Sequence, residues 1–503
     1  MCCHHLNRRE FVGVAAAGAN AAALFASSAP AWKPDWWDPS RPLVNPGKPL
    51  KVQPVLMYHV SQRREETSWK SWGGVQSHES AQQEASRIEA EWKALSARSD
   101  FPIEPLPVAK VTLPEEAPAN AGADVTVVYP ATGSGKLMHA LIPEKSRALL
   151  FVRRRSGPVS YWYEALSTRQ LRPEGMPLKA GDPRRLSVND VVVDDQDELL
   201  WRLRALYGVK NFLGARIVAL GGARGKYAAE APQVARERYR LDIVETSYDD
   251  LGKRIESALK EPTRMQQAER WAGRYLAMPN TALETERSFV VNAFALYGLF
   301  KEMMLEHEAF AFTINQCMNT IMPMAKTTAC LTLELLNDEG LMAFCESDFV
   351  IIPAGMLLRH IAARPVFLHN STFPHKGVVT CAHCTGPRRM DGDRYEPVRI
   401  LTHYESEYGA APKVEMPLGQ MVTCISPQYA TARWMGIRGV VEDNPFYEVC
   451  RSQQDVRILG QWRKLLNEVR DSHWVMAYGD FVKELAYAAP EIGVTLDTLE
   501  EAS

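Results

Sequence analysis

The chain has 503 residues, of which 46% are hydrophobic and 23% are charged, and its formal net charge is -2 at pH 7. This length exceeds what one hydrophobic core supports, so we expect roughly two to four domains of ~100–200 residues each. The near-neutral charge gives no reason to expect nucleic acid as a partner, because binding to phosphates requires a basic surface. The composition favours a globular protein with a small neutral or anionic ligand.

Residues 1–31 have the layout of a secretory signal peptide. Arg8 and Arg9 precede an alanine-rich apolar segment that ends in small residues at Ala29 and Ala31. The arginine pair followed by a phenylalanine resembles a twin-arginine signal, which predicts export to the periplasm. The alternative is a membrane anchor, but spanning requires ~20 strongly apolar residues. We expect no membrane span in the mature chain.

The first folded part of the sequence alternates strands with helices. Strands are predicted at residues 52–60, 124–129 and 148–153, and a helix is predicted at 80–98. Alternation at this spacing favours an open α/β sheet. We therefore expect an N-terminal α/β domain over residues 50–193.

A second α/β domain is expected over residues 194–370. Its predicted strands are 216–220, 241–245, 310–314, 341–345 and 365–368. Its predicted helices are 197–207, 248–259, 264–306, 324–337 and 349–362. Glycines at Gly221, Gly222 and Gly225 follow the first strand, but they do not form a GxGxxG dinucleotide motif. We interpret them as a tight turn between a strand and a helix.

Residues 371–503 lose the helical period and form the third predicted domain. Short alternating segments at 398–403, 421–425, 456–459 and 474–477 predict a small β domain, closed by a helix at 481–489.

The seven cysteines beyond the signal peptide all lie in the second half of the chain. Their number is odd, and their spacing does not match the pattern of a small disulfide-rich domain, so a disulfide framework is not expected. Cys381 and Cys384 invite a zinc or redox interpretation, but a structural zinc site needs a second pair of ligands, and none is evident at a suitable spacing. Buried thiols are the favoured interpretation.

Two acidic residues follow the predicted strand 341–345. In open α/β sheets, ligands bind beyond the carboxyl ends of the strands, and Glu346 and Asp348 would lie at that edge. The alternative is that both acids belong to a solvated turn. Their position predicts a functional site.

Four segments of the second half resemble the L-fucose isomerase family and, more distantly, L-arabinose isomerase. They are "ACLTLELLNDEGLMAFCESDFVIIPAGMLLRHIAARPVFLHN", "VVTCAHCTGPRRM", "VVEDNPFYEVCRSQQDVRI" and "SHWVMAYGDFVKELAYAAPEIGV". The resemblance covers roughly residues 310–494. It implies an α/β fold with two Rossmann-like open-sheet domains followed by a C-terminal β-barrel-like domain. It also implies a homo-oligomer, a trimer or hexamer, with active sites at subunit boundaries.

The activity implied by the resemblance is the interconversion of an aldose and a ketose with a divalent metal, commonly manganese. Moving a carbonyl through a cis-enediol requires a base and an acid near the carbon atoms. It also requires a hard cation that holds the sugar oxygens, for which carboxylate and imidazole ligands are suited.

The residues matched to the family's metal site are Asp348, His473 and His383. Asp348 corresponds to the carboxylate of the strand-end motif, here Cys345-Glu346-Ser347-Asp348. His473 matches the histidine of the last domain, and His383 matches a histidine that contacts the metal in arabinose isomerases. Asp348 and Glu346 are the expected catalytic residues.

One departure from the family pattern bears on activity. Thr320 stands where members carry a second carboxylate, and a threonine is neither an enolising base near neutral pH nor a good replacement for an anionic ligand. Either Glu346 or Glu339 takes its place, or the chain is a sugar-binding homologue without isomerase activity. A third alternative is a related epimerase or lyase with a different acid and base.

Substrate contacts are expected after the first strand. Family members place an arginine there, which Arg63 or Arg64 matches, although a solvated basic turn is an equal alternative. Trp72, like Trp69, offers an aromatic face for a sugar ring, and plain packing is the competing interpretation.

Overall fold

The computed structural model describes residues 32–70, 73–117, 122–157, 171, 186–429, 432–468 and 471–500. The expected signal peptide, residues 1–31, and Trp72 lie outside this part of the chain. The described residues fall into two compact units, one of them Lys48–Lys210 and the other Asn211–Ser503 together with the residues up to Gly47.

The unit Lys48–Lys210 is built on a parallel sheet with the order β2-β1-β4-β5-β6. Its strands are β1 (Leu50–Met57), β2 (Ile103–Pro105), β3 (Ala109–Val111), β4 (Val125–Pro130), β5 (Arg147–Val152) and β6 (Val191–Val193). β3 pairs with the second half of β1, beyond β2. All six residues of β4 are buried, as expected for an inner strand of a parallel sheet.

Among the described residues of this unit, three helices connect or follow these strands: α2 (His78–Arg98), α3 (Gly135–Leu141) and α5 (Gln196–Phe212). α2 begins with a capping box, in which the Ser77 hydroxyl accepts from the backbone of Ser80 and the Ser80 hydroxyl accepts from the backbone of Ser77. The apolar side of α2 places Ile88, Trp92 and Leu95 in the interior.

The other unit contains a second parallel sheet, with the order β11-β10-β7-β8. Its strands are β7 (Arg216–Leu220), β8 (Asp242–Thr246), β10 (Ala311–Ile314) and β11 (Met342–Phe344). The chain passes from β7 to β8 on one side and later returns to β10 on the other side of β7. The carboxyl ends of β7 and β10 therefore flank a topological switch point, where open α/β sheets bind ligands.

The helices of this sheet are α6 (Ala231–Arg238), α7 (Tyr248–Lys260), α8 (Pro262–Leu276), α9 (Arg287–Glu306), α10 (Cys317–Ala325), α11 (Cys330–Asp338) and α12 (Ile352–Ala362). The prediction of one helix over residues 264–306 is wrong, because strand β9 (Thr281–Leu283) separates α8 from α9. The predicted helix 324–337 is also wrong. Lys326 adopts the left-handed conformation with φ 50°, which ends α10 before α11 begins.

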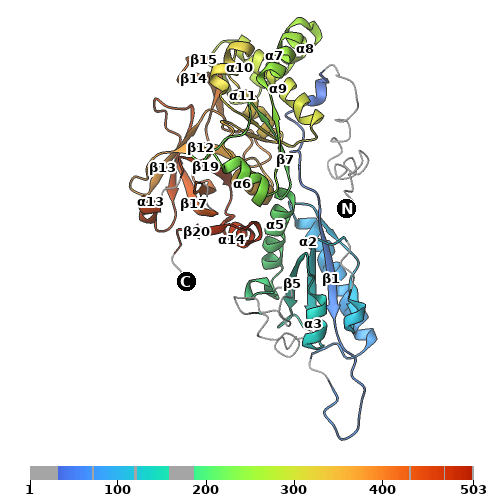
Figure 1. Cartoon of the computed structure of the whole chain (residues 1–503). Helices are drawn as coiled ribbons and strands as arrows, with labels where there is room; N and C mark the ends of the chain where they lie inside the picture. Colours follow the sequence, from blue (N-terminus) through green and yellow to red (C-terminus); the bar gives the residue numbers. More distant parts are fainter. Residues whose placement is uncertain are drawn as a thin grey trace. The chain divides into compact units, whose positions relative to one another are not determined.

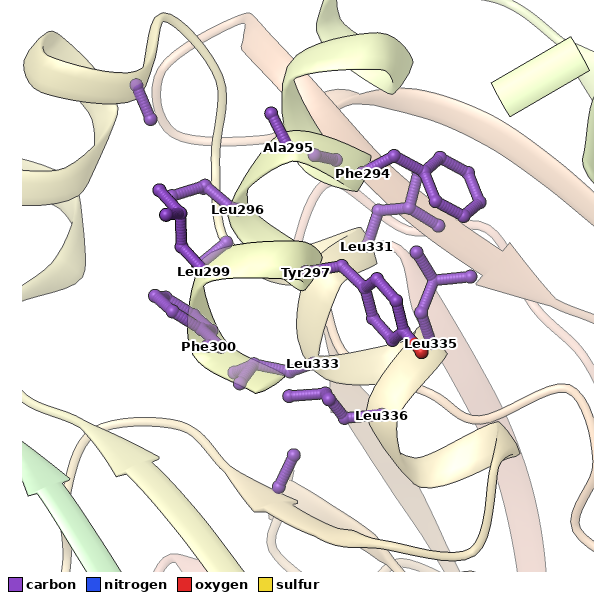
Figure 2. Close-up of a cluster of buried hydrophobic side chains, with 14 of the residues drawn as sticks. Phe294, Ala295, Leu296, Tyr297, Leu299, Phe300, Leu331, Leu333, Leu335 and Leu336 are labelled. Carbon is purple, nitrogen blue, oxygen red and sulfur yellow. The ribbon is translucent and has the colours of Figure 1, made fainter. Parts of the chain in front are cut away.

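The core of this sheet is centred on α9 and α11 (Figure 2). Phe294 and Tyr297 of α9 lie against Leu331 and Leu335 of α11, and all four side chains are buried. Burial of such a side chain contributes about 1.5–3 kcal/mol. Among the described helices, α9 alone is long and apolar enough by composition to cross a membrane, and 83% of its apolar window is buried inside the structure, as in the core helix of a globular domain.

The C-terminal part of the unit is a closed antiparallel barrel, in which β16 pairs with both β19 and β17. Its strands are β12 (Phe367–Ser371), β13 (Val378–His383), β16 (Met421–Pro427), β17 (Arg433–Asp443), β18 (Ser452–Ile458) and β19 (His473–Tyr478). β20 (Thr495–Thr498) pairs in parallel with the start of β17, and β14 (Val398–His403), β15 (Tyr408–Val414) and β9 form a small separate sheet. The predicted class, parallel α/β sheets followed by a β-barrel, is confirmed.

Short helices complete the chain: α13 (Arg463–Glu468), α14 (Val482–Ala488) and the 3-10 segments η3 (Pro34–Trp36), η4 (Pro114–Glu116), η6 (Val188–Asp190) and η7 (Ala489–Ile492). In Figure 1, β12 and β19 of the barrel lie near α6, and Nδ1 of His473 in β19 is 2.7 Å from Oδ2 of Asp348, which follows β11. Strand ends of the sheet and of the barrel thus come together within one compact unit.

Candidate functional site

The loop after β11 has an unusual backbone. Glu346 and Ser347 both have positive φ, 64° and 50°, although neither is glycine. Such conformations cost of order 1–3 kcal/mol each and persist only where the surroundings impose them. Here the turn after β7 does so, because the Ser347 hydroxyl donates to the Gly222 carbonyl at 2.8 Å and the Arg224 amide donates to the Ser347 carbonyl at 3.2 Å.

Asp348 lies fully buried at the end of this loop. Its Oδ1 accepts hydrogen bonds from the backbone amides of Lys226, at 2.8 Å, and Val350, at 3.2 Å. Its Oδ2 lies 2.7 Å from Nδ1 of His473, the first residue of barrel strand β19. Asp348 therefore connects the turn after β7, the end of β11 and the barrel.

His473 is fully buried between two carboxylates. Burial opposes its protonation, but the hydrogen bond to Asp348 and the charge of Glu346 outweigh burial and raise the pKa of His473 to about 9. Its Nε2 lies 3.5 Å from Glu346 Oε2 and 3.2 Å from Lys226 Nζ. The imidazole is thus held against Asp348 Oδ2, and a cation bound by this imidazole would displace a proton from it.

Glu346 is the accessible member of the group, with a side chain 31% exposed. Its carboxylate lies between His473 and His383, whose Nε2 is 3.7 Å from Oε1. Lys226 and Arg224 bring further positive charge to 3.9 and 3.8 Å. Burial works to raise the pKa of Glu346, yet His383 and His473 outweigh it and lower the pKa below its ordinary value. The carboxylate is ionised at neutral pH.

A third acid, Asp471, was not predicted from the sequence. Its Oδ1 accepts from the His473 amide at 3.1 Å, whereas its buried Oδ2 has no hydrogen-bond partner among the described residues. Burial raises the pKa of Asp471. Asp348, Asp471 and His473 each offer one ligand atom, and these atoms lie within 4.8 Å of one another, which makes them a potential metal-binding group.

The other residues considered for the metal site and for the missing carboxylate lie in different places. His383 faces Glu346 and is not one of the three residues of that group. Thr320 lies on α10, where its hydroxyl donates to the Gln316 carbonyl at 2.8 Å. Glu339 pairs with the buried Lys301 at 2.9 Å. Of the two acids offered as replacements for the missing carboxylate, Glu346 belongs to the site and Glu339 does not.

Cationic and imidazole side chains at the site were also missed. Arg224 and Lys226 come from the glycine turn after β7, interpreted from the sequence only as a tight turn; the basic residues inside it were the available signal. His369 of β12 is fully buried, and its Nε2 has no hydrogen-bond partner within the described part of the chain. Burial lowers the pKa of His369 to about 3, so this imidazole is neutral.

The expected substrate-binding residues lie in the unit Lys48–Lys210. Arg63 and Arg64 are exposed in the loop after β1. Trp72 lies outside the described residues, and Trp69 is half-buried.

Comparison with protein-family models finds no match to this chain, and comparison with curated proteins finds none either. The functional assignment therefore depends on the geometry of the site.

Proposed function

We propose that this protein is a metal-dependent aldose–ketose isomerase that acts on a free monosaccharide, with two Rossmann-like domains and a barrel as in the L-fucose isomerases. The observation that carries the proposal is the group Asp348, Asp471 and His473 beside the accessible Glu346, at the carboxyl ends of parallel strands. This is where an α/β sheet binds a ligand, and the group offers hard donors beside an ionised carboxylate.

The metal-binding residues in this proposal are Asp348, Asp471 and His473. Their chemistry fits a hard divalent cation such as manganese, and the Oδ2 atom of Asp471 is a buried acceptor with no hydrogen-bond partner among the described residues. When bound, the cation would hold sugar oxygens and stabilise negative charge as it develops.

Glu346 is the proposed proton carrier. Its carboxylate is ionised and partly open to solvent, so it can accept the proton from C2 of an aldose and return it to C1, while a second proton passes from the O2 hydroxyl to O1. Positive charge from Lys226 and Arg224 would favour the anionic enediolate. Thr320 has no part in this chemistry. Glu346 takes the role of the second carboxylate that L-fucose isomerases carry at the position of Thr320.

Tyr227 is the proposed contact for a sugar ring. It follows Lys226 directly, is 79% exposed and has a positive φ of 60°. Its ring lies edge-on to Tyr429 at a centroid distance of 5.9 Å. Burial and the charge of Asp471 raise the pKa of Tyr429, which places this aromatic pair within electrostatic reach of the site.

The test is hydrogen exchange at C2. The mature protein is incubated in deuterium oxide with a panel of aldoses, with and without manganese, and the metal content of the purified protein is measured in parallel. We expect deuterium incorporation, formation of the matching ketose and dependence on the metal. Glu346→Gln should lower exchange by about 10²–10⁴-fold while Glu256→Gln, an exposed acid on α7, leaves it unchanged.

Other outcomes identify the alternatives. Stabilisation by a sugar without exchange or turnover would favour the sugar-binding homologue suggested by Thr320, since a ligand that binds only the native state stabilises it. Consumption of a sugar without its ketose would favour an epimerase or lyase. Export to the periplasm and assembly as a trimer or hexamer belong to the same proposal, and light scattering of the mature protein measures the assembly.

A further inference from the structure

A second group of metal-type ligands lies away from the charged site. Cys330, Cys384 and His403 are all buried, and their ligand atoms lie within 4.8 Å of one another. Cys450 packs against the same pair of cysteines and hydrogen-bonds to Cys384. These four residues are called the thiol group below.

The members of the thiol group come from four different elements. Cys330 begins α11, Cys384 follows β13 directly, His403 ends β14 and Cys450 precedes β18. Residues this far apart in the sequence escape a search for zinc motifs, which relies on short spacing between ligands. The fold supplies the further ligands that the sequence does not show near Cys384.

His403 gives an independent indication of a ligand. Its Nδ1 is buried without a hydrogen-bond partner among the described residues, and a buried polar atom in that state costs about 1–3 kcal/mol. A metal ion beside it would remove this cost. The apolar Ala411 packs against the cysteines, and the carboxylate of Glu405 acts electrostatically on both His403 and Cys450, which favours a cation at this position.

We propose that Cys330, Cys384, Cys450 and His403 bind a structural zinc ion. Three thiolates and one imidazole are one of the established ligand sets of closed, tetrahedral zinc sites, and thiolates disfavour the hard cations that suit the carboxylate site. The ion would tie α11 to the strands β13 and β14. Since His383, which precedes Cys384, faces Glu346, the zinc would also fix one wall of the candidate active site.

The experiment separates this zinc from any metal at the carboxylate site. The mature protein carrying Asp348→Asn, which disables the carboxylate site, is purified under reducing conditions, stripped of metal and titrated with zinc against a chromogenic chelator. We expect one tightly bound zinc per chain. Replacement by cobalt should give the intense visible and thiolate-to-cobalt absorption bands of a tetrahedral thiolate site.

Two ligand variants are used, so that the test does not depend on the folding of a single variant. Cys450→Ser, at a half-buried position, should lower zinc affinity at least tenfold and remove part of the thiolate-to-cobalt absorption. His403→Gln should lower zinc affinity as much but keep the thiolate-to-cobalt absorption, because it removes no thiolate. Cys424→Ser, a buried thiol of the barrel outside the thiol group, should change neither. The proposal is overturned if the reduced protein binds no zinc, if Cys450→Ser and His403→Gln bind it as tightly as the parent, or if mass spectrometry of the unreduced protein shows Cys384 in a disulfide.

Discussion

Two groups of acidic side chains flank β11 in the sequence, and they behave differently. Before β11, Glu334 and Asp338 of α11 form a sealed pair, with Tyr275 donating to both Glu334 oxygens at 3.1 Å. After β11, Glu346 and Asp348 face imidazoles and side chains that reach solvent. The sealed pair has no accessible member, whereas Glu346 is 31% exposed.

The two groups also differ in protonation: the pKa values are raised in the sealed pair, whereas the pKa of Glu346 is lowered. Burial raises the pKa of Asp338 to about 6 and that of Glu334 well above its ordinary value. The buried cations Arg388 and Arg389 oppose this rise but do not overcome it. At the site, two imidazoles and two cationic side chains keep Glu346 ionised. Burial of an acid alone therefore does not identify a site.

The largest expected effect comes from breaking the charged group at Asp348. Asp348→Asn removes the carboxylate that joins the turn after β7 to His473, and we expect C2 exchange to fall by about 10²–10⁴-fold. The bound metal should be lost from the carboxylate site in the same variant, as measured by elemental analysis. Asp249→Asn, an exposed acid of α7, is the control. Exchange at the parental rate in Asp348→Asn would contradict the role given to the group.

Breaking the packing around the sealed pair should affect stability and leave the site intact. Leu335→Ala opens a cavity between α11 and α9, and we expect it to lower the free energy of unfolding by about 2–5 kcal/mol. Urea denaturation measures this loss, and Leu259→Ala, a half-exposed leucine of α7, should cost less than about 0.5 kcal/mol. If Leu335→Ala also abolished C2 exchange well below the unfolding transition, the separation between the two groups would be wrong.

The sealed pair should make the protein less stable as pH rises. Both acids have raised pKa values in the folded state. The unfolded acids lose their protons near about pH 4, whereas Asp338 in the folded state keeps its proton up to about pH 6. Above about pH 4 the folded state therefore binds more protons than the unfolded state. The free energy of unfolding then falls with pH over this window.

Glu334→Gln tests this directly, because an amide can donate to Asp338 without titrating. We expect the decline in stability between pH 4.5 and 7 to be smaller than in the parent by about 1–2 kcal/mol. Urea denaturation at several pH values measures it, with Glu256→Gln as a control that should follow the parent. An unchanged pH profile in Glu334→Gln would show that the pair is not the source.

The sequence predicted the local elements well where the pattern was unambiguous. β7 and β14 were predicted at the observed residues, since β7 is a short apolar run followed by glycines and β14 is a short segment in which apolar and polar residues alternate. The breaks between α8 and α9 and between α10 and α11 were missed. Nothing in the periodicity marks the left-handed backbone of Lys326, which depends on how the two helices pack.

The site was predicted in part, for a physical reason. Glu346 and Asp348 follow a strand, so their position at the sheet edge can be read locally. Asp471 and Lys226 become part of the site through contacts across the fold. The hydrogen bond from the Lys226 amide to Asp348 spans 122 residues and the one from His473 spans 125. No spacing in the sequence reports such contacts, and the same holds for the four ligands of the thiol group.

The smallest expected effect concerns the accessible edge of the site, which the sealed pair does not have. Tyr227→Ala should raise KM for the sugar roughly threefold to tenfold, because an aromatic face contributes about 0.5–1.5 kcal/mol to such packing. The catalytic rate constant should stay unchanged, as expected when uniform binding is lost. Tyr447→Ala, an exposed tyrosine of the barrel region, is the matched control. Since Tyr227 is 79% exposed, its removal should leave stability within about 0.5 kcal/mol. A loss in the rate constant with KM unchanged would instead mean that Tyr227 positions Lys226 and does not bind the sugar.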